Sequence, residues 1–200
     1  MKNNLLSERL TYNGDNGTHT HVHLICYSAE HCDEIVCQDF DKIASLTAPD
    51  DKLWIRVHGL KDTEYIRNLC TYFNINFLMM QDILNVDHPS KIEKNGDFNF
   101  VVTRIFHDDT AIAIRLIQGN NVVLTFTEGE ARFFDDAAKA LENNVLKIRT
   151  RSSDYLFSVL FNEVVSSYVS QAIEIGDQMD DLETELLAAT TSYNIRMQLQ

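Results

Sequence analysis

The sequence has little proline, few basic residues and no long apolar run. Only two of its 200 residues are proline, and 17 lysines and arginines stand against 30 aspartates and glutamates, which gives a net charge of −13. So acidic a surface repels phosphate backbones and anionic lipid headgroups, which argues against nucleic acid and a membrane surface as partners and favours cations. A membrane-spanning helix needs about 20 apolar residues, so we expect none of these residues to cross a membrane.

Several motifs are also missing. The four cysteines, Cys26, Cys32, Cys37 and Cys70, form no CxxC pair, and no signal peptide opens the chain. We interpret them as reduced thiols of a cytosolic protein. The sequence has no GxGxxG, GxxxxGK[ST], HExxH or GxSxG motif, which disfavours an enzyme. The overall composition, 44% apolar and 10% aromatic, is typical of a globular chain with a substantial core.

Hydrophobic periodicity predicts a mixture of strands and helices. Alternation predicts strands from Thr20 and over residues 52–58, and Asn95-Gly96 is a hairpin signal at the start of a four-strand antiparallel meander. The meander strands are expected at residues 91–94, 97–106, 111–117 and 122–126. Helices are expected at residues 39–46, from the N-cap Asp62 to Phe73, at 77–84 and at 130–141.

From Ser153 the pattern changes to a long acidic helix. Ser152 and Ser153 are expected to cap its start, Gly176 is its weak point, and residues 193–200 are expected to belong to another helix, cut off in mid-course. Its apolar residues recur at the spacing of a coiled coil: Tyr168, Ala172, Ile175, Met179, Leu182 and Leu186.

The predicted fold class is α+β. We expect an α/β/α sandwich with a mixed, largely antiparallel sheet over residues 1–150, followed by long stalk-type helices that begin with an acidic helical arm over residues 151–200.

Three groups of residues could bind a metal. His19, His21 and His23 share one strand face and could bind zinc or nickel, but they need a fourth ligand and are more typical of a solvent-facing polar strand. Asp108 and the adjacent Asp109 fit a β-turn better than a hydrolase dyad with His107.

The third group centres on Asp82, at the end of an amphipathic helix. The helix macrodipole opposes a carboxylate there, so a bound hard cation is a plausible compensation, although most such carboxylates are ordinary surface residues.

An ordered set of short motifs resembles the CorA family of magnesium and cobalt transporters. The matching stretches are residues 54–60, Leu78 with 81–85 (QDILN), Pro89, 91–93 (KIE), 98–102, 120–126 and 153–156. The resemblance covers residues from about 50 to the end, and its order is more specific than any one motif.

The resemblance implies the cytoplasmic, cation-sensing part of a homopentameric transporter at the inner (plasma) membrane. Mg²⁺ or Co²⁺ bound between neighbouring domains would hold the pore closed, with Asp82 as one ligand and an acidic residue beyond Gln200 as its partner. Relatives often have Glu at Gln81 and Asp at Asn162, so a second cation site is in doubt. The Gly-Met-Asn pore motif and both transmembrane helices are expected further along the native chain.

Three other interpretations remain open. A zinc-transporting relative of the same architecture is suggested by the histidines and by Gln81. A metal-dependent hydrolase would use Asp82, Asp87, His88, His107 and Asp109. An adaptor would assemble through residues 153–190 without any response to cations.

Overall fold

The computed structural model describes the chain except for residues 1–8, 38–42, 44–50, 108–109, 131 and 199–200. The strands are β1 His21–Tyr27, β2 Cys32–Cys37, β3 Lys52–His58, β4 Lys91–Asn95, β5 Phe98–His107, β6 Thr110–Gln118 and β7 Val122–Thr127. The helices are α2 Thr63–Tyr72, α3 Phe77–Leu84, α4 Asp135–Glu142 and α5 Ser153–Gln198, with a 3-10 segment η1 at Val145–Thr150.

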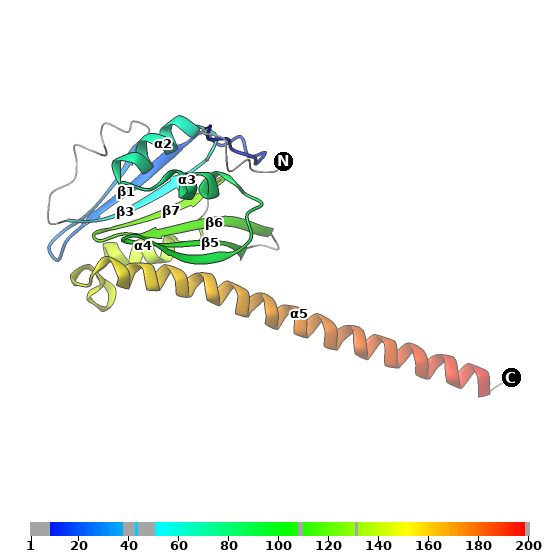
Figure 1. The fold of residues 1–200 in the computed structure, drawn as a ribbon. Helices are drawn as coiled ribbons and strands as arrows, with labels where there is room; N and C mark the ends of the chain where they lie inside the picture. The colour runs from blue at the N-terminus through cyan, green and yellow to red at the C-terminus, as the bar shows by residue number, and fades with distance from the viewer. Residues whose placement is uncertain (1–8, 38–42, 44–50, 108–109, 131, 199–200) are drawn as a thin grey trace.

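Within the described residues the strands form one mixed sheet in the order β2-β1-β3-β7-β6-β5-β4. Helices α2 and α3 cover one face, while α4 and the start of α5 cover the other (Figure 1). This arrangement confirms the predicted α+β class and the α/β/α sandwich. The division of the chain between residues 150 and 151 stays a prediction.

Two antiparallel units meet at one parallel pair of strands. On one side β1 pairs with both β2 and β3, and on the other β4, β5, β6 and β7 form the predicted antiparallel meander. Strands β3 and β7 join the two units in parallel. The first meander turn lies one residue later than predicted, because Asn95 pairs with Phe98 and leaves Gly96, at φ +59°, and Asp97 as the loop.

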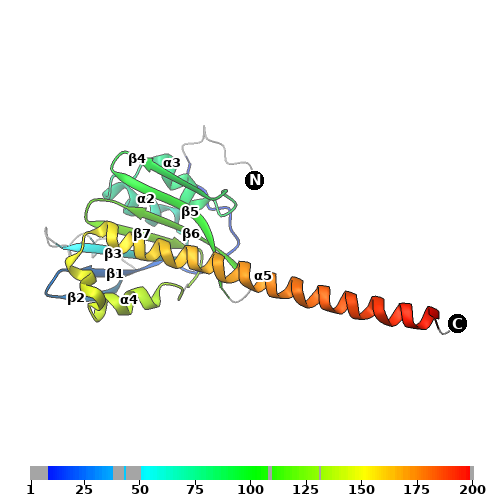
Figure 2. The same cartoon turned by 90° about the horizontal axis from the view of Figure 1, so that it is seen from below.

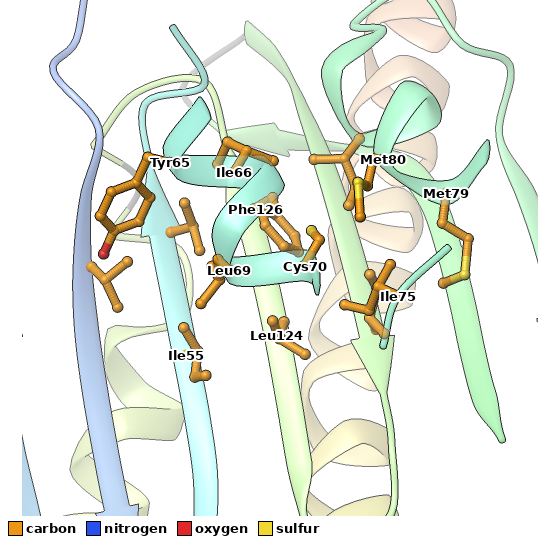
Figure 3. Packing of buried hydrophobic residues seen from close by; sticks show 14 of the residues in the cluster. Ile55, Tyr65, Ile66, Leu69, Cys70, Ile75, Met79, Met80, Leu124 and Phe126 are labelled. Carbon is orange, nitrogen blue, oxygen red and sulfur yellow. The ribbon is translucent and has the colours of Figure 1, made fainter. Parts of the chain in front are cut away.

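Both faces of the central strands are buried, so their sequences are apolar at nearly every position. On β3, Ile55 faces the core under α2 and α3, and its neighbour Trp54 faces the core under α4 and α5. Figure 3 shows the first of these cores, in which Leu69 of α2 packs over Ile55 and Leu124. The Trp54 indole N–H donates to Thr125 Oγ1 at 3.2 Å, which satisfies a buried donor.

Side-chain caps start the two helices on this face. Asp62 Oδ1 accepts from the backbone N–H of Tyr65 at 2.9 Å, which confirms its predicted role. Asn76 caps α3 in the same way through the N–H of Met79. The helix expected at residues 39–46 lies outside the described residues except for Ile43, which is helical and buried.

Helix α4 begins at Asp135, not at residue 130 as predicted. The Gly129 carbonyl accepts a hydrogen bond from Thr127 Oγ1 at 2.8 Å, so the chain is still tied to the end of β7 at that point. The helix starts where Phe134 enters the core and where two carboxylates, Asp135 and Asp136, complement the positive end of the dipole.

Helix α5 is continuous from Ser153 to Gln198, so the separate helix predicted for residues 193–200 is wrong, and Gly176 does not interrupt it. The prediction that the Ser153 side chain caps the helix is wrong. Its buried hydroxyl donates instead to the carbonyls of Gly119 (2.9 Å) and Asn120 (2.6 Å). These bonds attach the start of α5 to the β6–β7 turn.

Only the first part of α5 packs on the sheet, through Leu156, Leu160 and Val164. Tyr168 faces the sheet rather than a partner helix, since its ring contacts Phe106 (centroids 5.3 Å apart) and its hydroxyl lies 3.1 Å from Thr103 Oγ1. Beyond it the helix projects away from the sandwich (Figure 2). No helix in the described part of the chain is long and apolar enough to span a bilayer.

One carboxyl group in the packed part of α5 is in an unfavourable place. Glu163 Oε2 is buried and has no hydrogen-bond partner among the described residues. Burial and, to a smaller extent, the nearby Asp136 carboxylate raise the pKa of Glu163 to about 7, although Arg56 opposes the shift. The folded state therefore favours the protonated form of this side chain.

We expect Glu163→Gln to reduce the pH dependence of stability between about pH 4.5 and 7. In the unfolded chain the Glu163 carboxyl ionises near its ordinary pKa, while the folded chain keeps the proton up to about pH 7, so the wild type loses stability as pH rises through this window. Glutamine cannot ionise. Urea unfolding at several pH values should show the variant gaining on the wild type up to about pH 7, whereas Glu183→Gln, on the exposed part of α5, should follow the wild type. Parallel curves for all three proteins would contradict this assignment.

Candidate cation site

Asp82 lies in the last turn of α3, with the side chains of Lys91 and His88 beside its carboxylate. Lys91 Nζ is 2.7 Å from Asp82 Oδ2, and His88 Nε2 is 3.3 Å from Oδ1. The Asp82 side chain is only 15% exposed, so this group is at the surface but partly shielded from water. In the single chain the carboxylate predicted to bind a cation already has a counter-charge, the Lys91 ammonium.

The turn after α3 brings these residues together. Asn85 ends the helix in an extended conformation, and Asn13, from the N-terminal segment, holds the turn. The Asn13 side chain accepts from the N–H of Val86 (2.8 Å) and donates to Asn85 Oδ1 (2.7 Å). The chain then enters β4, whose first residue is Lys91.

Burial opposes the charge on Lys91, but its hydrogen bonds to Asp82 and Glu93 outweigh burial, and the pKa of Lys91 lies above its ordinary value. The ammonium also sits over the Phe100 ring, 5.3 Å from its centroid. Lys91 is therefore a fixed, fully protonated partner of Asp82 at neutral pH.

A second cation lies beneath the site. Arg115 of β6 is completely buried, and its guanidinium donates to the carbonyls of Asp82 (3.3 Å) and Asn85 at the end of α3. Burial lowers the pKa of Arg115 to about 10, with Glu128 opposing, so it stays charged at neutral pH. A positive charge at a helix C-terminus is favourable and offsets the cost of placing Asp82 there.

Neither Lys91 nor Arg115 could be assigned a role at this site from the sequence alone. Lys91 was noted only as part of a motif, and Arg115 only as one residue of a predicted strand. A lysine nine residues after an aspartate is a weak signal until the turn between them is known. For Arg115, a charged residue inside an apolar strand was the available signal, since an arginine buried in a sheet needs acceptors.

The residues expected to form a hydrolase site are only partly close to one another in the structure. His88 reaches Asp82, whereas Asp87 contacts Asn13 Nδ2 at 3.4 Å. The side chain of His107 and the whole of Asp109 lie outside the described residues.

His21 and His23 lie on one face of β1, as predicted, and His58 of the neighbouring strand lies beside them. The rings of His21 and His23 lie 5.6 Å apart, and His58 of β3 lies 5.3 Å from each because β3 pairs alongside β1. Their Nδ1 atoms contact His19 O, Glu34 Oε1 and Thr127 Oγ1. Within the described residues these imidazoles do not converge as metal ligands.

The environment of His58 also disfavours a charged imidazole. Burial and the charge of Arg56 lower the pKa of His58 to about 4, so its ring is neutral at physiological pH. With Arg56 and Glu130, His23 and His58 line a cavity of about 430 Å³.

The two positions that departed from the expected pattern differ in exposure. Gln81 is buried, at 5% exposure, so it is not a surface ligand position, and Asn162 is exposed on α5.

The fold is shared with several solved structures, among them the soluble domain of a CorA protein. The described chain superposes on the soluble domain of CorA from Methanocaldococcus jannaschii with a TM-score of 0.57 at 19% identity, covering 82% of this chain and 64% of that one. The ZntB cytoplasmic domain from Vibrio parahaemolyticus gives 0.57 at 9% identity, covering 80% and 64%. The full-length CmaX protein gives 0.65 at 13% identity, covering 86% and 52%. At these identities the likeness shows the fold alone.

Sequence comparison identifies the family. Residues 50–199 match the model of the CorA-like Mg²⁺ transporter protein family, so the chain belongs to that family, whose members are transporters and not enzymes. This membership replaces the hydrolase interpretation. The cobalt/magnesium transport protein CorA of Thermotoga maritima is 28% identical over 184 residues, covering 89% of this chain and 52% of that protein. Its Methanocaldococcus jannaschii counterpart is 24% identical over 152 residues, covering 74% and 48%. The chain thus spans about half the length of these relatives.

We expect the Asp82–Lys91 pair to contribute measurable coupling to stability. In a double-mutant cycle with Asp82→Asn and Lys91→Met, urea unfolding should give a coupling free energy of about 1 kcal/mol, because both groups are partly shielded from water and directly hydrogen-bonded. The exposed Asp136–Lys139 pair is the control and should give about 0 to 0.5 kcal/mol. Equal coupling in the two pairs would show that Lys91 is not a specific partner of Asp82.

Proposed function

We propose that this chain is the cytoplasmic, cation-sensing portion of a longer CorA-type transporter of Mg²⁺ or Co²⁺ at the inner (plasma) membrane. Asp82 is the proposed ligand for a regulatory divalent cation, shared with an acidic residue that lies beyond Gln200 on a neighbouring subunit. The observation that carries this proposal is the position of the Asp82 carboxylate. It lies at the end of α3, beside the turn that Asn13 stabilises, and is partly exposed at the surface of an acidic chain of this family.

The local charges suggest how a cation would act. In the single chain the Lys91 ammonium balances the charge of Asp82, so a divalent cation has to displace that ammonium from the carboxylate. A neighbouring carboxylate would favour that exchange, because it adds a negative charge that Mg²⁺ can bridge and that a single ammonium balances less well. The cation would then stabilise the arrangement of subunits that brings the two carboxylates together.

The exposed part of α5 supports assembly into the homopentamer. Ile175, Met179 and Leu182 lie at coiled-coil spacing and are each about half or more exposed, which is unusual for large apolar side chains on a helix that stays isolated. We propose that this face packs against equivalent helices in the full-length assembly.

Millimolar Mg²⁺ should stabilise the chain against thermal unfolding through Asp82. We expect the midpoint to rise by about 3 °C when the cation is about tenfold above its dissociation constant. The shift should largely disappear in Asp82→Ala and should need less Mg²⁺ in Lys91→Met, since the competing ammonium is gone.

Asp87→Asn is the matched control, because it removes a neighbouring carboxylate that pairs with Asn13 instead. A Mg²⁺ response unchanged in Asp82→Ala would remove the assignment of the site while leaving the family intact. Stabilisation by micromolar Zn²⁺ that depends on Asp82, together with indifference to millimolar Mg²⁺, would favour the zinc-transporting alternative.

A further inference from the structure

Three side chains with metal-binding atoms meet where β1 ends, apart from the Asp82 site. Cys26 Sγ lies 3.1 Å from Asp51 Oδ2, and His31 Nε2 lies 3.5 Å from the same oxygen. The three donor atoms all lie within 4.8 Å of one another. A thiol, an imidazole and a carboxylate that converge in this way form a chemically mixed group that ordinary core packing does not require.

The sheet register explains why they meet. Strand β1 is flanked on both sides near its end, and Cys26 pairs with Asp33 of β2 and with Leu53 of β3. Because both neighbours run antiparallel to β1, the turn into β2 and the residue just before β3 lie at the same end of the sheet. His31 is the last residue of that turn, and Asp51 immediately precedes β3.

The turn also fixes the orientation of the imidazole. The Ser28 hydroxyl lies 2.7 Å from His31 Nδ1, and the Ser28 N–H donates to the His31 carbonyl at 3.0 Å. In the tautomer protonated on Nδ1, His31 donates to Ser28, and the Nε2 lone pair points to the same place as the thiol and the carboxylate. An outer hydrogen bond of this kind is typical of histidines that bind metals.

The donor set selects the class of ion. Sulfur and nitrogen ligands suit Zn²⁺ and Co²⁺, whereas Mg²⁺ requires oxygen ligands. A tetrahedral Zn²⁺ site with bonds of about 2.0–2.3 Å places its ligand atoms about 3–4 Å apart. The separations of 3.1 Å and 3.5 Å from Asp51 Oδ2 to Cys26 Sγ and His31 Nε2 fall in this range. One thiolate and one carboxylate balance the charge of the ion, and water can fill the fourth position.

A nucleophilic role for Cys26 fits the structure less well. The residue is 6% exposed, and burial together with the Asp51 carboxylate raises the pKa of Cys26 to about 12, so the free thiol stays protonated and unreactive. A bound metal ion changes this situation, since it stabilises the thiolate directly and the thiol proton leaves to solvent. Access is from the side of His31, whose side chain is 42% exposed.

We propose that Cys26, His31 and Asp51 form a binding site for a thiophilic divalent cation, Zn²⁺ or Co²⁺, within one subunit. The site clamps the β1–β2 turn to the start of β3. It is independent of the proposed magnesium site, because it uses other residues and a different coordination chemistry.

Titration of the reduced chain with Co²⁺ tests the site directly. We expect one equivalent to bind with tetrahedral d–d bands and a thiolate-to-cobalt charge-transfer band, and Zn²⁺ to displace the cobalt and abolish both. Cys26→Ser and His31→Ala should each abolish the charge-transfer band or shift it to much higher Co²⁺ concentration. Ser28→Ala, which removes only the outer hydrogen bond, should weaken Zn²⁺ binding by about tenfold.

Cys32→Ser is the matched control, because it removes a half-buried thiol next to His31 that lies outside the cluster, and it should retain the band. His31→Ala changes a partly exposed turn residue, so it tests the site even if Cys26→Ser folds poorly. Asp82→Ala should also retain the band, which separates this site from the proposed regulatory one. A thiolate band that survives in Cys26→Ser, or the absence of such a band in the wild type at millimolar Co²⁺, would overturn the proposal.

Discussion

The parallel pairing of β3 with β7 is the constraint on which the rest of the molecule depends. The two strands are joined in register from Leu53 with Val122 to His58 with Thr127, and their backbone bonds extend past both ends, from Leu53 N to Asn121 O and from Gly59 N to Thr127 O. A parallel pair needs a long connection, and here that connection contains α2, α3 and the first three strands of the meander. Helices α2 and α3, which cover one face of the sheet, therefore belong to the connection that the central parallel pair requires.

The same pairing places the two proposed metal sites in different structural settings. The Asp82 site lies where a helix ends over the meander, and its geometry depends on a buried arginine, a lysine and a segment from near the N-terminus. The Cys26 site belongs to the other antiparallel unit, where three strands lie side by side and their ends coincide. The Asp82 site offers carboxylate oxygen that already pairs with the Lys91 ammonium, and the Cys26 site adds sulfur and nitrogen to its carboxylate oxygen. A protein exposed to several divalent ions could distinguish them by this division of chemistry.

The sequence predicted the elements better than the sites. Strand alternation, the Asp62 cap and the meander could be predicted because they depend on neighbouring residues, whereas the role of Asp82 rests on a family motif and stays a proposal. Lys91, Arg115 and Asp51 could not be assigned roles, since each acquires its partners only through strand register or a tertiary turn. The start of α4 was missed because Gly129 is held by Thr127, a contact that helical periodicity does not report. Cys26 was interpreted only as one of four reduced thiols, which says nothing of its two polar neighbours.

The way α5 leaves the sandwich has a mechanical consequence. Its first residue is hydrogen-bonded to the β6–β7 turn, its first turns are embedded in the core, and its last described contact with the sheet is made by Tyr168. The remainder of the helix is about 45 Å long at 1.5 Å per residue. A tilt of about 5° at the sheet therefore moves the far end by about 4 Å, at an unchanged helix length. The sheet is thus the short arm of a lever, and small changes in the angle between the sheet and α5 become displacements as large as a side chain at the far end of the helix.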